Sequence, residues 1–398
     1  MTSTGTTTAT GPLAPTGAVR ARTVRLGDVS DAEAERWADL VDRALEPNPF
    51  LSPAYLLTAS RWLARTAGIV LVVVERDDRM IALLPLSRGG RFHGTPLRCA
   101  TTAGAFLKDD SPLCAPLVDA EHAATALDHL LRFLADRRNG FPPLVELTLL
   151  PGDGPLHDAL HDACRRARVT LLERSRFERA VLDRSSAAPP PREALSPSKR
   201  KQVERLTRRL EEATGATLRW EDRGEDPQAF QDFVALEAAG WKGDAGRDGG
   251  ALQVTPGAVE WFTDVTDGLR ARRSLHLLTL VAGDDVVYMS LQFAAAGSLF
   301  SLMDTYDERF ARFSPGVIGR VMEQEHVLER TTADRFDPCM HPKNAGPTAL
   351  YRDRRPLVGV VLATRGVLPR LLLRSVPALR GLRTRVARTP REIVEDAT

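Results

Sequence analysis

The sequence lacks several features that would assign a protein to a class at once. Its 398 residues include four cysteines, which lie far apart and form no CxxC pair. Zinc-ribbon spacing and a dense disulfide framework are therefore both missing, and we expect free thiols in a reducing cytoplasm. No apolar run in the sequence approaches the ~20 residues that span a bilayer. Lysine and arginine total 54 against 52 for aspartate and glutamate, so a basic surface can arise only from how the charges are distributed.

Common catalytic motifs are missing as well. The sequence contains no GxGxxG, Walker A, GxSxG or HExxH pattern. His157 and His161 lie four residues apart on an expected helix, but no third ligand stands near them in the sequence, and we predict no metal site. Hydrophobic residues make up 43% and charged residues 27%, which is typical of a globular protein.

The first half reads as one α/β unit after a polar leader. Residues 1–22 are rich in Thr, Ala and Gly and lack the apolar stretch of a secretory signal, so we predict a disordered leader. Apolar spacing and β-branched runs then predict a domain over residues 23–184. Its expected elements are helices at 28–43 and from 52, strands at 69–75 and 80–87, a helix at 120–136, a strand at 144–150, a helix at 155–168 and a strand from 169.

A linker and a basic helix follow at residues 185–212. Ser196 is suited to cap that helix, and Pro197 to occupy its first turn. Six positive charges lie on it: Lys199, Arg200, Lys201, Arg205, Arg208 and Arg209.

The second half, residues 213–364, repeats the order of the first. Helices are expected at 226–240 and 255–272, strands at 275–282, 286–294 and 299–305, a helix at 315–330, and strands from 335 and at 357–363, the last of which would close the sheet. Each half therefore reads helix, helix, strand, strand, with a further strand before the next helix. This order predicts an internally duplicated α/β fold with a mixed sheet and two halves side by side.

The segment Met303–Glu323 carries the strongest chemical signal. A strand ends near Asp304, and a loop leads through Ser314, Pro315 and Gly316 into a helix. Proline suits the first helical turn, and glycine leaves the backbone N–H groups of that turn open to an anion such as a pyrophosphate.

Several motifs together resemble the CelD-like branch of the GNAT acyltransferases, which is similar to the FemABX peptidyltransferases. The resemblance covers residues 22–364. It rests on NPFLSP at 48–53, LLPL at 83–86, the basic helix at 199–210, EAAGWKG at 237–243, TYD at 305–307, SPG at 314–316 and FD at 336–337.

The resemblance implies a duplicated GNAT fold whose C-terminal half carries the active centre. It also implies direct acyl transfer from a thioester or aminoacyl ester to an amine or hydroxyl. The expected co-substrate is an acyl-CoA, the expected acceptor a small molecule, and the expected location the cytoplasm. The sequence departs from the usual GNAT pyrophosphate signature because Pro315 stands where its first glycine belongs, which leaves Gly316 and Gly319 as the analogue.

Direct acyl transfer needs a proton acceptor, a stabilised oxyanion and an aligned donor. Asp304, Asp307, His341 and Lys242 are the candidate catalytic residues, and a nucleophilic Cys339 is not expected. The predicted donor-binding residues are Ser314, Pro315, Gly316, Val317 and Gly319. The predicted acceptor-binding residues are Trp241, Tyr306, Lys343 and Asn344.

Two other hypotheses stay open. The basic helix and the altered signature favour an aminoacyl-tRNA-dependent transferase. Residues 365–398 interleave arginines with leucines, a pattern that suits weak contact with an anionic membrane and a non-catalytic scaffold for envelope or polysaccharide assembly. A terminal helix that packs its leucines on the domain explains the same pattern.

Overall fold

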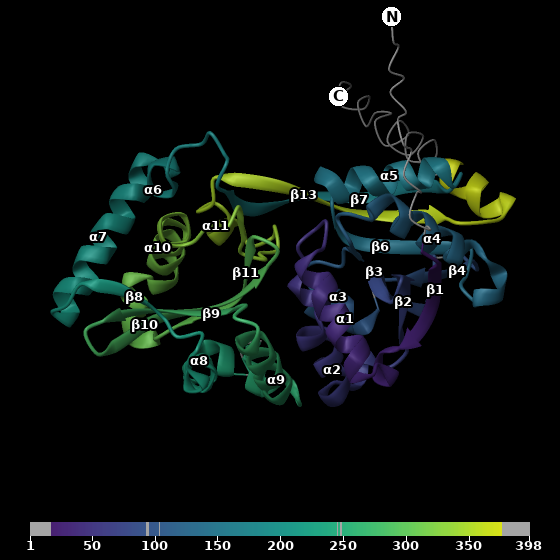
Figure 1. The fold of residues 1–398 in the computed structure, drawn as a ribbon. Helices are drawn as coiled ribbons and strands as arrows, with labels where there is room; N and C mark the ends of the chain where they lie inside the picture. Colours follow the sequence, from purple (N-terminus) through teal and green to yellow (C-terminus); the bar gives the residue numbers. More distant parts are fainter. Residues whose placement is uncertain (1–16, 93–94, 103, 245, 247–248, 376–398) are drawn as a thin grey trace, which may run out of the picture.

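The computed structural model describes residues 17–92, 95–102, 104–244, 246 and 249–375. Two lobes lie side by side, with the N-terminal half on the right of Figure 1 and the C-terminal half on the left. One mixed sheet joins thirteen strands of the described chain and runs through both lobes. Helices pack on this sheet, so the predicted α/β class is confirmed.

The N-terminal half keeps the predicted elements in the predicted order and adds strands at 19–25, 98–101 and 117–118 and a helix at 105–110, which were not predicted. Ser30 caps its first helix, because its hydroxyl accepts the Glu33 N–H while the Glu33 carboxylate accepts the Ser30 N–H. The expected restart at Ser52 is a π-helical turn (Pro53–Leu57) that leads into a short helix. The elements are β1 (Val19–Arg25), α1 (Asp31–Asp42), α2 (Thr58–Trp62), β2 (Ile69–Arg76), β3 (Arg79–Arg91), β4 (Arg98–Thr101), α3 (Ala105–Asp110), β5 (Leu117–Val118), α4 (Ala123–Ala135), β6 (Leu144–Pro151), α5 (Gly154–Arg166) and β7 (Thr170–Asp183).

The C-terminal half begins with the basic helix, capped by Ser196 as predicted. Its elements are α6 (Pro191–Ala194), α7 (Pro197–Thr214), β8 (Leu218–Asp222), α8 (Pro227–Ala239), η6 (Trp241–Gly243), α9 (Ala258–Ala271), β9 (Leu275–Ala282), β10 (Asp285–Ala295), β11 (Ser298–Tyr306), η9 (Glu308–Phe313), α10 (Pro315–Arg330), β12 (Arg335–Asp337), α11 (Ala345–Thr348) and β13 (Asp353–Ala363). Helix α7 packs against η9 and α10, so the predicted linker segment forms part of this lobe.

The order of strands across the sheet shows the duplication directly. It runs β1-β2-β3-β4-β6-β13-β7-β12-β11-β10-β9-β8. In each half, five strands follow one another from the outer edge of the sheet to the middle: β1, β2, β3, β4 and β6 in the first half, and β8 to β12 in the second. In each half, one adjacent pair is parallel over three residues: β4 with β6, and β11 with β12. This correspondence confirms the predicted duplicated fold.

The two halves exchange their last strands at the centre of the sheet. Strand β13 pairs with β6 and β7 of the N-terminal half, and β7 reaches across to β12. The long arrow of β13 therefore spans both lobes in Figure 1. The prediction that residues 357–363 close the sheet of the second half is wrong, because a continuous apolar run identifies a strand but not its neighbour.

The predicted leader is also too long. Residues Val19 to Arg25 form β1, which pairs with β2 over its whole length, so part of the segment 1–22 belongs to the sheet. Residues 1–16 lie outside the described part of the chain. Arg22 explains the early start, because its guanidinium binds Glu75 on β2 at 3.0 Å and Glu33 on α1 at 2.7 Å.

Buried contacts make the two lobes one body. Tyr55 of the first half meets Trp261 of the second with ring centroids 4.9 Å apart, and Phe50 lies 5.6 Å from Phe300. Arg355 on β13 pairs with the buried Glu46 at 2.7 Å. Removing either partner of such a pair leaves a buried charge uncompensated.

The described part of the C-terminal tail is a short helix over residues 367–375. Leu373 is buried and Leu372 packs beside it, while Val367, Leu368 and Leu371 are exposed. The packing hypothesis thus accounts for some leucines of this helix, and the membrane contact stays a prediction. Residues 376–398 lie outside the described chain.

Candidate active site

A cavity of about 540 Å³ opens where β11 and β12 separate. The two strands pair only from Ser298 to Phe300 with Arg335 to Asp337, and then diverge. One wall is the continuing β11, residues 301–304, and the other is the loop after β12, residues 338–341. Helix α10 contributes Arg320 and Glu323.

Ion pairs fix most of the charged groups in this cavity. Asp304 binds Arg320 at 2.6 Å and accepts a hydrogen bond from the Tyr288 hydroxyl at 3.0 Å. Lys242 donates to the backbone carbonyl of Asp304 at 2.5 Å and lies 3.5 Å from the buried Glu237. The structure thus brings two of the predicted catalytic residues, Asp304 and Lys242, into one network.

Glu323 is a functional candidate that the sequence analysis missed. Its carboxylate is buried and accepts a hydrogen bond from the Gln292 side chain at 2.7 Å. Burial, and after it the nearby Asp304 charge, raise the pKa of Glu323 to about 7. A signal was present in the sequence, because residues 316, 319 or 320, 323 and 327 share one helical face. A glutamate on a face that begins with two glycines and ends in valine is a candidate for a buried acid.

Two buried tyrosines lie beside this network: Tyr351 lines the cavity, and Tyr288 contacts Asp304. Burial raises the pKa of both hydroxyls well above the usual value, so Tyr288 and Tyr351 stay protonated. The Tyr288 hydroxyl donates to Asp304. The Tyr351 hydroxyl is buried and has no hydrogen-bond partner within the described residues.

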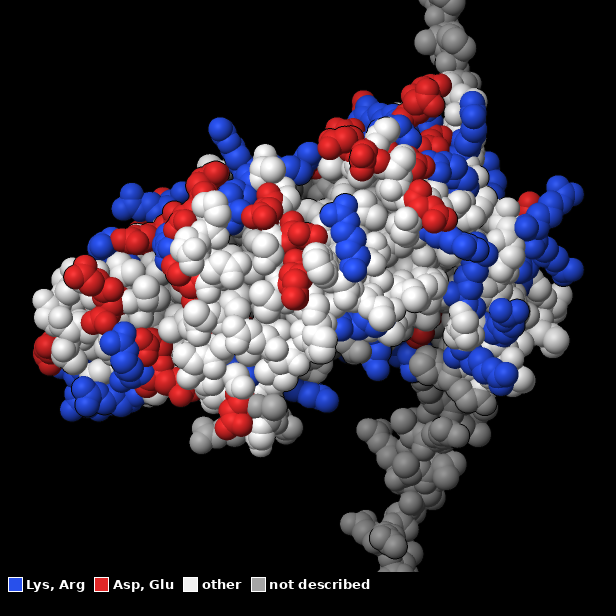
Figure 2. Space-filling view, turned by 90° about the horizontal axis from the view of Figure 1, so that it is seen from below, with Lys and Arg blue, Asp and Glu red and all other residues white. Residues whose placement is uncertain are grey.

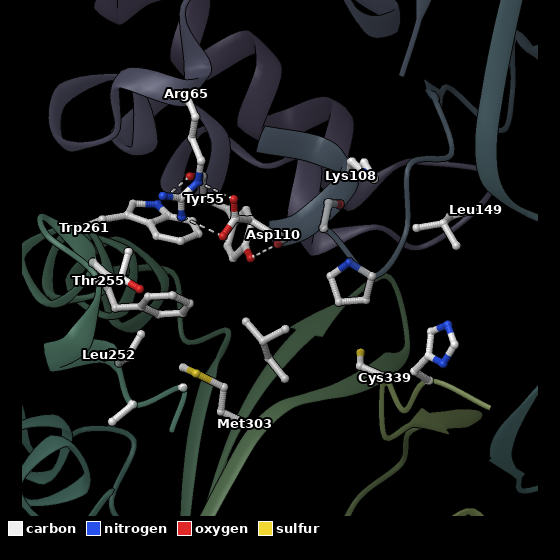
Figure 3. A pocket seen from close by; sticks show the side chains of 18 of the residues that line it. Tyr55, Arg65, Lys108, Asp110, Leu149, Leu252, Thr255, Trp261, Met303 and Cys339 are labelled. Carbon is white, nitrogen blue, oxygen red and sulfur yellow. Dashed lines mark hydrogen bonds and ion pairs between the residues drawn. The ribbon is translucent and has the colours of Figure 1, made fainter. Parts of the chain in front are cut away.

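The cavity continues into a second hollow of about 460 Å³ between the lobes. Met303, Cys339 and His341 line both, so the two form one cleft. Figure 3 shows this second hollow, with Arg65 and Tyr55 from the N-terminal half and Trp261 from the C-terminal half around it.

Residues of the N-terminal half form one wall of the hollow between the lobes, and hydrogen bonds among them fix its side chains. Arg65 binds Asp110 through two hydrogen bonds of 2.6 and 2.7 Å, and the Tyr55 hydroxyl donates to the Asp110 carbonyl. The His341 ring stacks on Phe177 with centroids 6.2 Å apart. The cleft therefore needs both lobes for its walls.

Cys339 lies in the cleft as a thiol. Burial, followed by the charge of Asp337, raises its pKa well above the ordinary value. A protonated thiol is a poor nucleophile, so the geometry gives this residue no covalent role.

The start of α10, where the donor-binding residues were predicted, is a tight turn that uses most of its own backbone N–H groups, and its residues Ser314, Pro315, Gly316, Val317 and Gly319 do not line the cavity. Ser314 adopts a left-handed conformation (φ 55°), its carbonyl accepts the N–H groups of Val317 and Ile318, and Pro315 opens the helix. Gly316 has room for a methyl group, with Tyr306 and Arg320 atoms at ordinary contact distance. Gly319 has none, because a Cβ there would lie 2.6 Å from the Tyr288 ring. Packing therefore requires glycine at position 319 but not at position 316.

The remaining predicted residues divide between the cleft and other places. Trp241, His341 and Asn344 line the cavity. Tyr306 packs beside the start of α10, and Lys343 is exposed, its N–H donating to His341 Nδ1. Asp307 caps η9, with its carboxylate on the Arg309 N–H at 2.8 Å and on the Arg309 guanidinium, and it does not line the cleft.

Comparison with known proteins shows one family match and several solved structures with a similar fold. Residues 197–341, from the start of α7 to His341, match the acetyltransferase (GNAT) domain family. None of the curated proteins matches the chain. A crystal structure of FemX is 11% identical, with 83% of this chain and 95% of that chain covered and a TM-score of 0.52.

Two further solved structures are similar at lower scores. The C-terminal domain of a putative lysylphosphatidylglycerol synthetase from Agrobacterium fabrum is 12% identical, with 88% and 97% covered and a TM-score of 0.48. A tandem GNAT protein from the clavulanic acid biosynthesis pathway is 13% identical, with 88% and 100% covered and a TM-score of 0.38. The family match and the fold shared with FemX confirm the resemblance predicted from the motifs.

One face of the molecule carries charged side chains of both signs around a broad area of other residues (Figure 2). Among the described residues, every helix is too short or too polar to cross a membrane.

Proposed function

The chain carries a GNAT-type acyltransferase domain, and from that premise we propose that it transfers an acyl group from an acyl thioester to an amine or hydroxyl of a small molecule. The donor is an acyl-CoA or an acyl carrier protein. The transfer is direct, with both substrates bound in the cleft at once.

The observation that carries the proposal is the separation of β11 from β12 beside the start of α10. Beyond Phe300, the β12-facing edge of β11 pairs with no strand in the described chain. An extended acyl-thioester arm suits this edge, because its amides match backbone groups that no strand takes. The Gly316 N–H, in the first turn of α10, suits a phosphate of the same donor.

The hollow between the lobes suits the acceptor. It meets the cavity at Met303, Cys339 and His341, so a molecule there faces the end of the donor arm. Its aromatic walls bury apolar groups, and the Arg65–Asp110 pair with Lys108 adds polar contacts. Such a mixture is typical of small-molecule sites.

Thiol release from a panel of acyl-CoAs, with mass spectrometry of the products, tests the proposal. We expect release that depends on an added amine or alcohol acceptor. Gly316→Ala should raise the KM for acyl-CoA severalfold without loss of stability, whereas Gly89→Ala, where a Cβ meets no atom within 4 Å, should leave KM unchanged. Absence of transfer from every acyl-CoA and acyl carrier protein contradicts the proposal.

The basic helix favours one second candidate, an aminoacyl-tRNA donor. Lys201, Arg205, Arg208 and Arg209 are exposed on α7, which packs against η9 next to the start of α10. Filter binding with charged tRNA distinguishes the two. Affinity that falls steeply with salt and is lost in Lys201→Glu/Arg205→Glu favours tRNA, while saturable acyl-CoA binding opposes it.

A further inference from the structure

The helix over residues 367–375 exposes apolar side chains on one face. Val367, Leu368 and Leu371 are 71%, 75% and 55% exposed, which are the highest values among the large apolar side chains of the described chain. Positions i, i+1 and i+4 lie on one side of a helix. Leu373 lies on the opposite side and is buried against β4, β6 and β13. Single exposed apolar residues are common, but three on one helical face indicate an interaction surface.

Two sets of contacts fix this helix on the N-terminal lobe. At its start, the Arg365 guanidinium donates to the backbone carbonyls of Leu134, at 2.9 Å, and of Phe141. Towards its end, Leu373 packs with Phe92 and Cys99. The exposed apolar face therefore belongs to an element that is docked on the lobe by its other side.

Arginines dominate the end of the N-terminal lobe on which this helix lies. Three segments meet there, residues 88–101, 136–142 and 364–375, and together they carry eight arginines and one acidic residue, Asp136. Figure 1 places β4 and the end of the described chain at the outer end of this lobe, and basic side chains gather at the same end in Figure 2. A chain with a formal net charge of +2 thus concentrates positive charge at one end.

Contacts join the three segments into one surface. Leu97 of the first segment packs in the same apolar cluster as Leu373 of the third. Arg88 lies over the ring of Phe141 at 4.3 Å, and the Phe141 carbonyl accepts the hydrogen bond from Arg365. Six arginines of this surface form no ion pair with any residue that the structure describes: Arg91, Arg98, Arg137, Arg138, Arg370 and Arg374.

These unpaired arginines indicate an anionic partner. Arg91 and Arg98 lie directly opposite each other in the pairing of β3 with β4. Like charges in that arrangement are destabilising, and a bound anion removes the repulsion. By contrast, Arg166 of the same lobe already has an acidic partner, because it binds Asp128 at 2.8 Å.

We propose that this end of the N-terminal lobe binds an anionic membrane surface. The apolar face of the helix enters the boundary between headgroups and acyl chains, and the arginines bind lipid phosphates. Five further arginines follow the helix in the sequence, at positions 380, 383, 385, 388 and 391. None of the described residues of this surface lines the cleft, so the inference goes beyond the proposed acyl transfer and does not depend on it.

Other occupants fit the surface less well. A nucleic acid would neutralise the arginines but would leave Val367, Leu368 and Leu371 in water. A second copy of the same face would set arginine against arginine, because a twofold contact brings like surfaces together. An anionic lipid surface supplies negative charge and an apolar phase at once.

Sedimentation with vesicles tests the proposal without any enzymatic assay. We expect the full chain to bind vesicles of phosphatidylcholine mixed equally with phosphatidylglycerol, and to bind pure phosphatidylcholine much more weakly. Binding should fall as the salt concentration rises, because ions screen the attraction. Absence of binding to the mixed vesicles, or equal binding to both kinds, overturns the proposal.

Two double variants test the apolar and the charged part of the surface separately. Leu368→Ser/Leu371→Ser should lower the partition coefficient on mixed vesicles roughly tenfold or more, because both leucines leave the interface. Arg91→Glu/Arg98→Glu should lower it by a similar factor and weaken its dependence on salt. All four side chains are exposed, so thermal unfolding should show that both variants fold. Wild-type binding by either folded variant contradicts the proposal.

Each variant has a control on the C-terminal lobe. Val254→Ser removes another exposed apolar side chain, and Lys201→Glu/Arg205→Glu makes the same change of charge on α7. Neither control should change vesicle binding.

Filter binding with RNA and analytical ultracentrifugation test the other two occupants. RNA binding that is lost in Arg91→Glu/Arg98→Glu, without binding to vesicles, would assign the surface to a nucleic acid. Self-association that is lost in Leu368→Ser/Leu371→Ser, again without binding to vesicles, would assign it to a second copy of the chain. Either result overturns the membrane proposal.

Discussion

At the scale of single residues, Gly319 is a packing position. A methyl group on it would meet the ring of Tyr288 at 2.6 Å, and that ring is fully buried. We expect Gly319→Ala to lower the free energy of unfolding by about 1–3 kcal/mol, because a packed core resists added volume. Gly316→Ala should be neutral or slightly stabilising, since alanine favours the helix by ~0.5–1 kcal/mol. Urea denaturation of both variants checks this, and equal losses would contradict the assignment.

Asp307, a predicted catalytic residue, lies outside the cleft. Its carboxylate caps η9 and pairs with the exposed Arg309. Asparagine caps as well as aspartate, and an exposed ion pair contributes no more than ~1 kcal/mol. We expect Asp307→Asn to keep kcat and to lose less than ~1 kcal/mol of stability. Steady-state rates with an acyl-CoA and an amine test this, and a large fall in kcat would return Asp307 to the catalytic candidates.

Glu323 makes stability depend on pH in an unusual direction. Its pKa rises from 4.5 to about 7 on folding, so between those values the folded state holds a proton that the unfolded state has lost. The contribution of this group to stability is therefore greatest below pH 4.5, falls as pH rises and levels off above about 7. Glu323→Gln should be more stable than wild type above neutral pH, by up to ~3 kcal/mol, and similar at acid pH.

Chemical denaturation of the two proteins across this window measures the difference. Glu325→Gln, which removes an ion pair with Arg192, should not reproduce the gain at high pH. A constant difference between Glu323→Gln and wild type at all pH values would contradict a raised pKa.

At the scale of elements, the capping box of α1 stabilises the N-terminus of this helix. Ser30 accepts the Glu33 N–H, and the return bond from the Ser30 N–H is the main reason why the pKa of Glu33 falls to about 2. Ser30→Ala should cost about 1 kcal/mol, typical of a lost cap. Glu35→Gln on the same helix, with no hydrogen bond or ion pair among the described residues, is the control for thermal unfolding. An unchanged melting temperature in Ser30→Ala would show that the cap contributes nothing.

At the scale of the whole molecule, the exchange of β7 and β13 couples the two halves. Strand β13 lies between β6 and β7, so the N-terminal sheet is incomplete without the end of the chain. We expect one cooperative unfolding transition, with circular dichroism and tryptophan fluorescence in agreement. Residues 1–184 expressed alone should not fold stably, because removing β13 exposes the edges of both neighbours. Two separate transitions, or a stable isolated half, would contradict this coupling.

Some residues of the candidate site could be predicted from the sequence, and others could not. The sequence patterns and the family resemblance together pointed to Asp304, Lys242, Trp241, His341 and Asn344, all of which line the cavity. The approach of Arg65 and Tyr55 to Trp261 joins residues about two hundred positions apart in the chain, and no local pattern carries that information. Glu323 was missed because a glutamate on a helix reads as an exposed residue until the burial of its face is known.

The amino-acid sequence was enough to predict most helices and strands, the Ser196 cap, the duplication and the resemblance to GNAT acyltransferases. Most of these features depend on residues within a few positions of one another, where propensity and periodicity act. The folded structure shows which strands are neighbours, that Glu323 is buried without an ion-pair partner among the described residues, and that the cleft takes walls from both halves. Strand pairing and burial are set by contacts between distant segments, and the free energy of each charge follows from that burial.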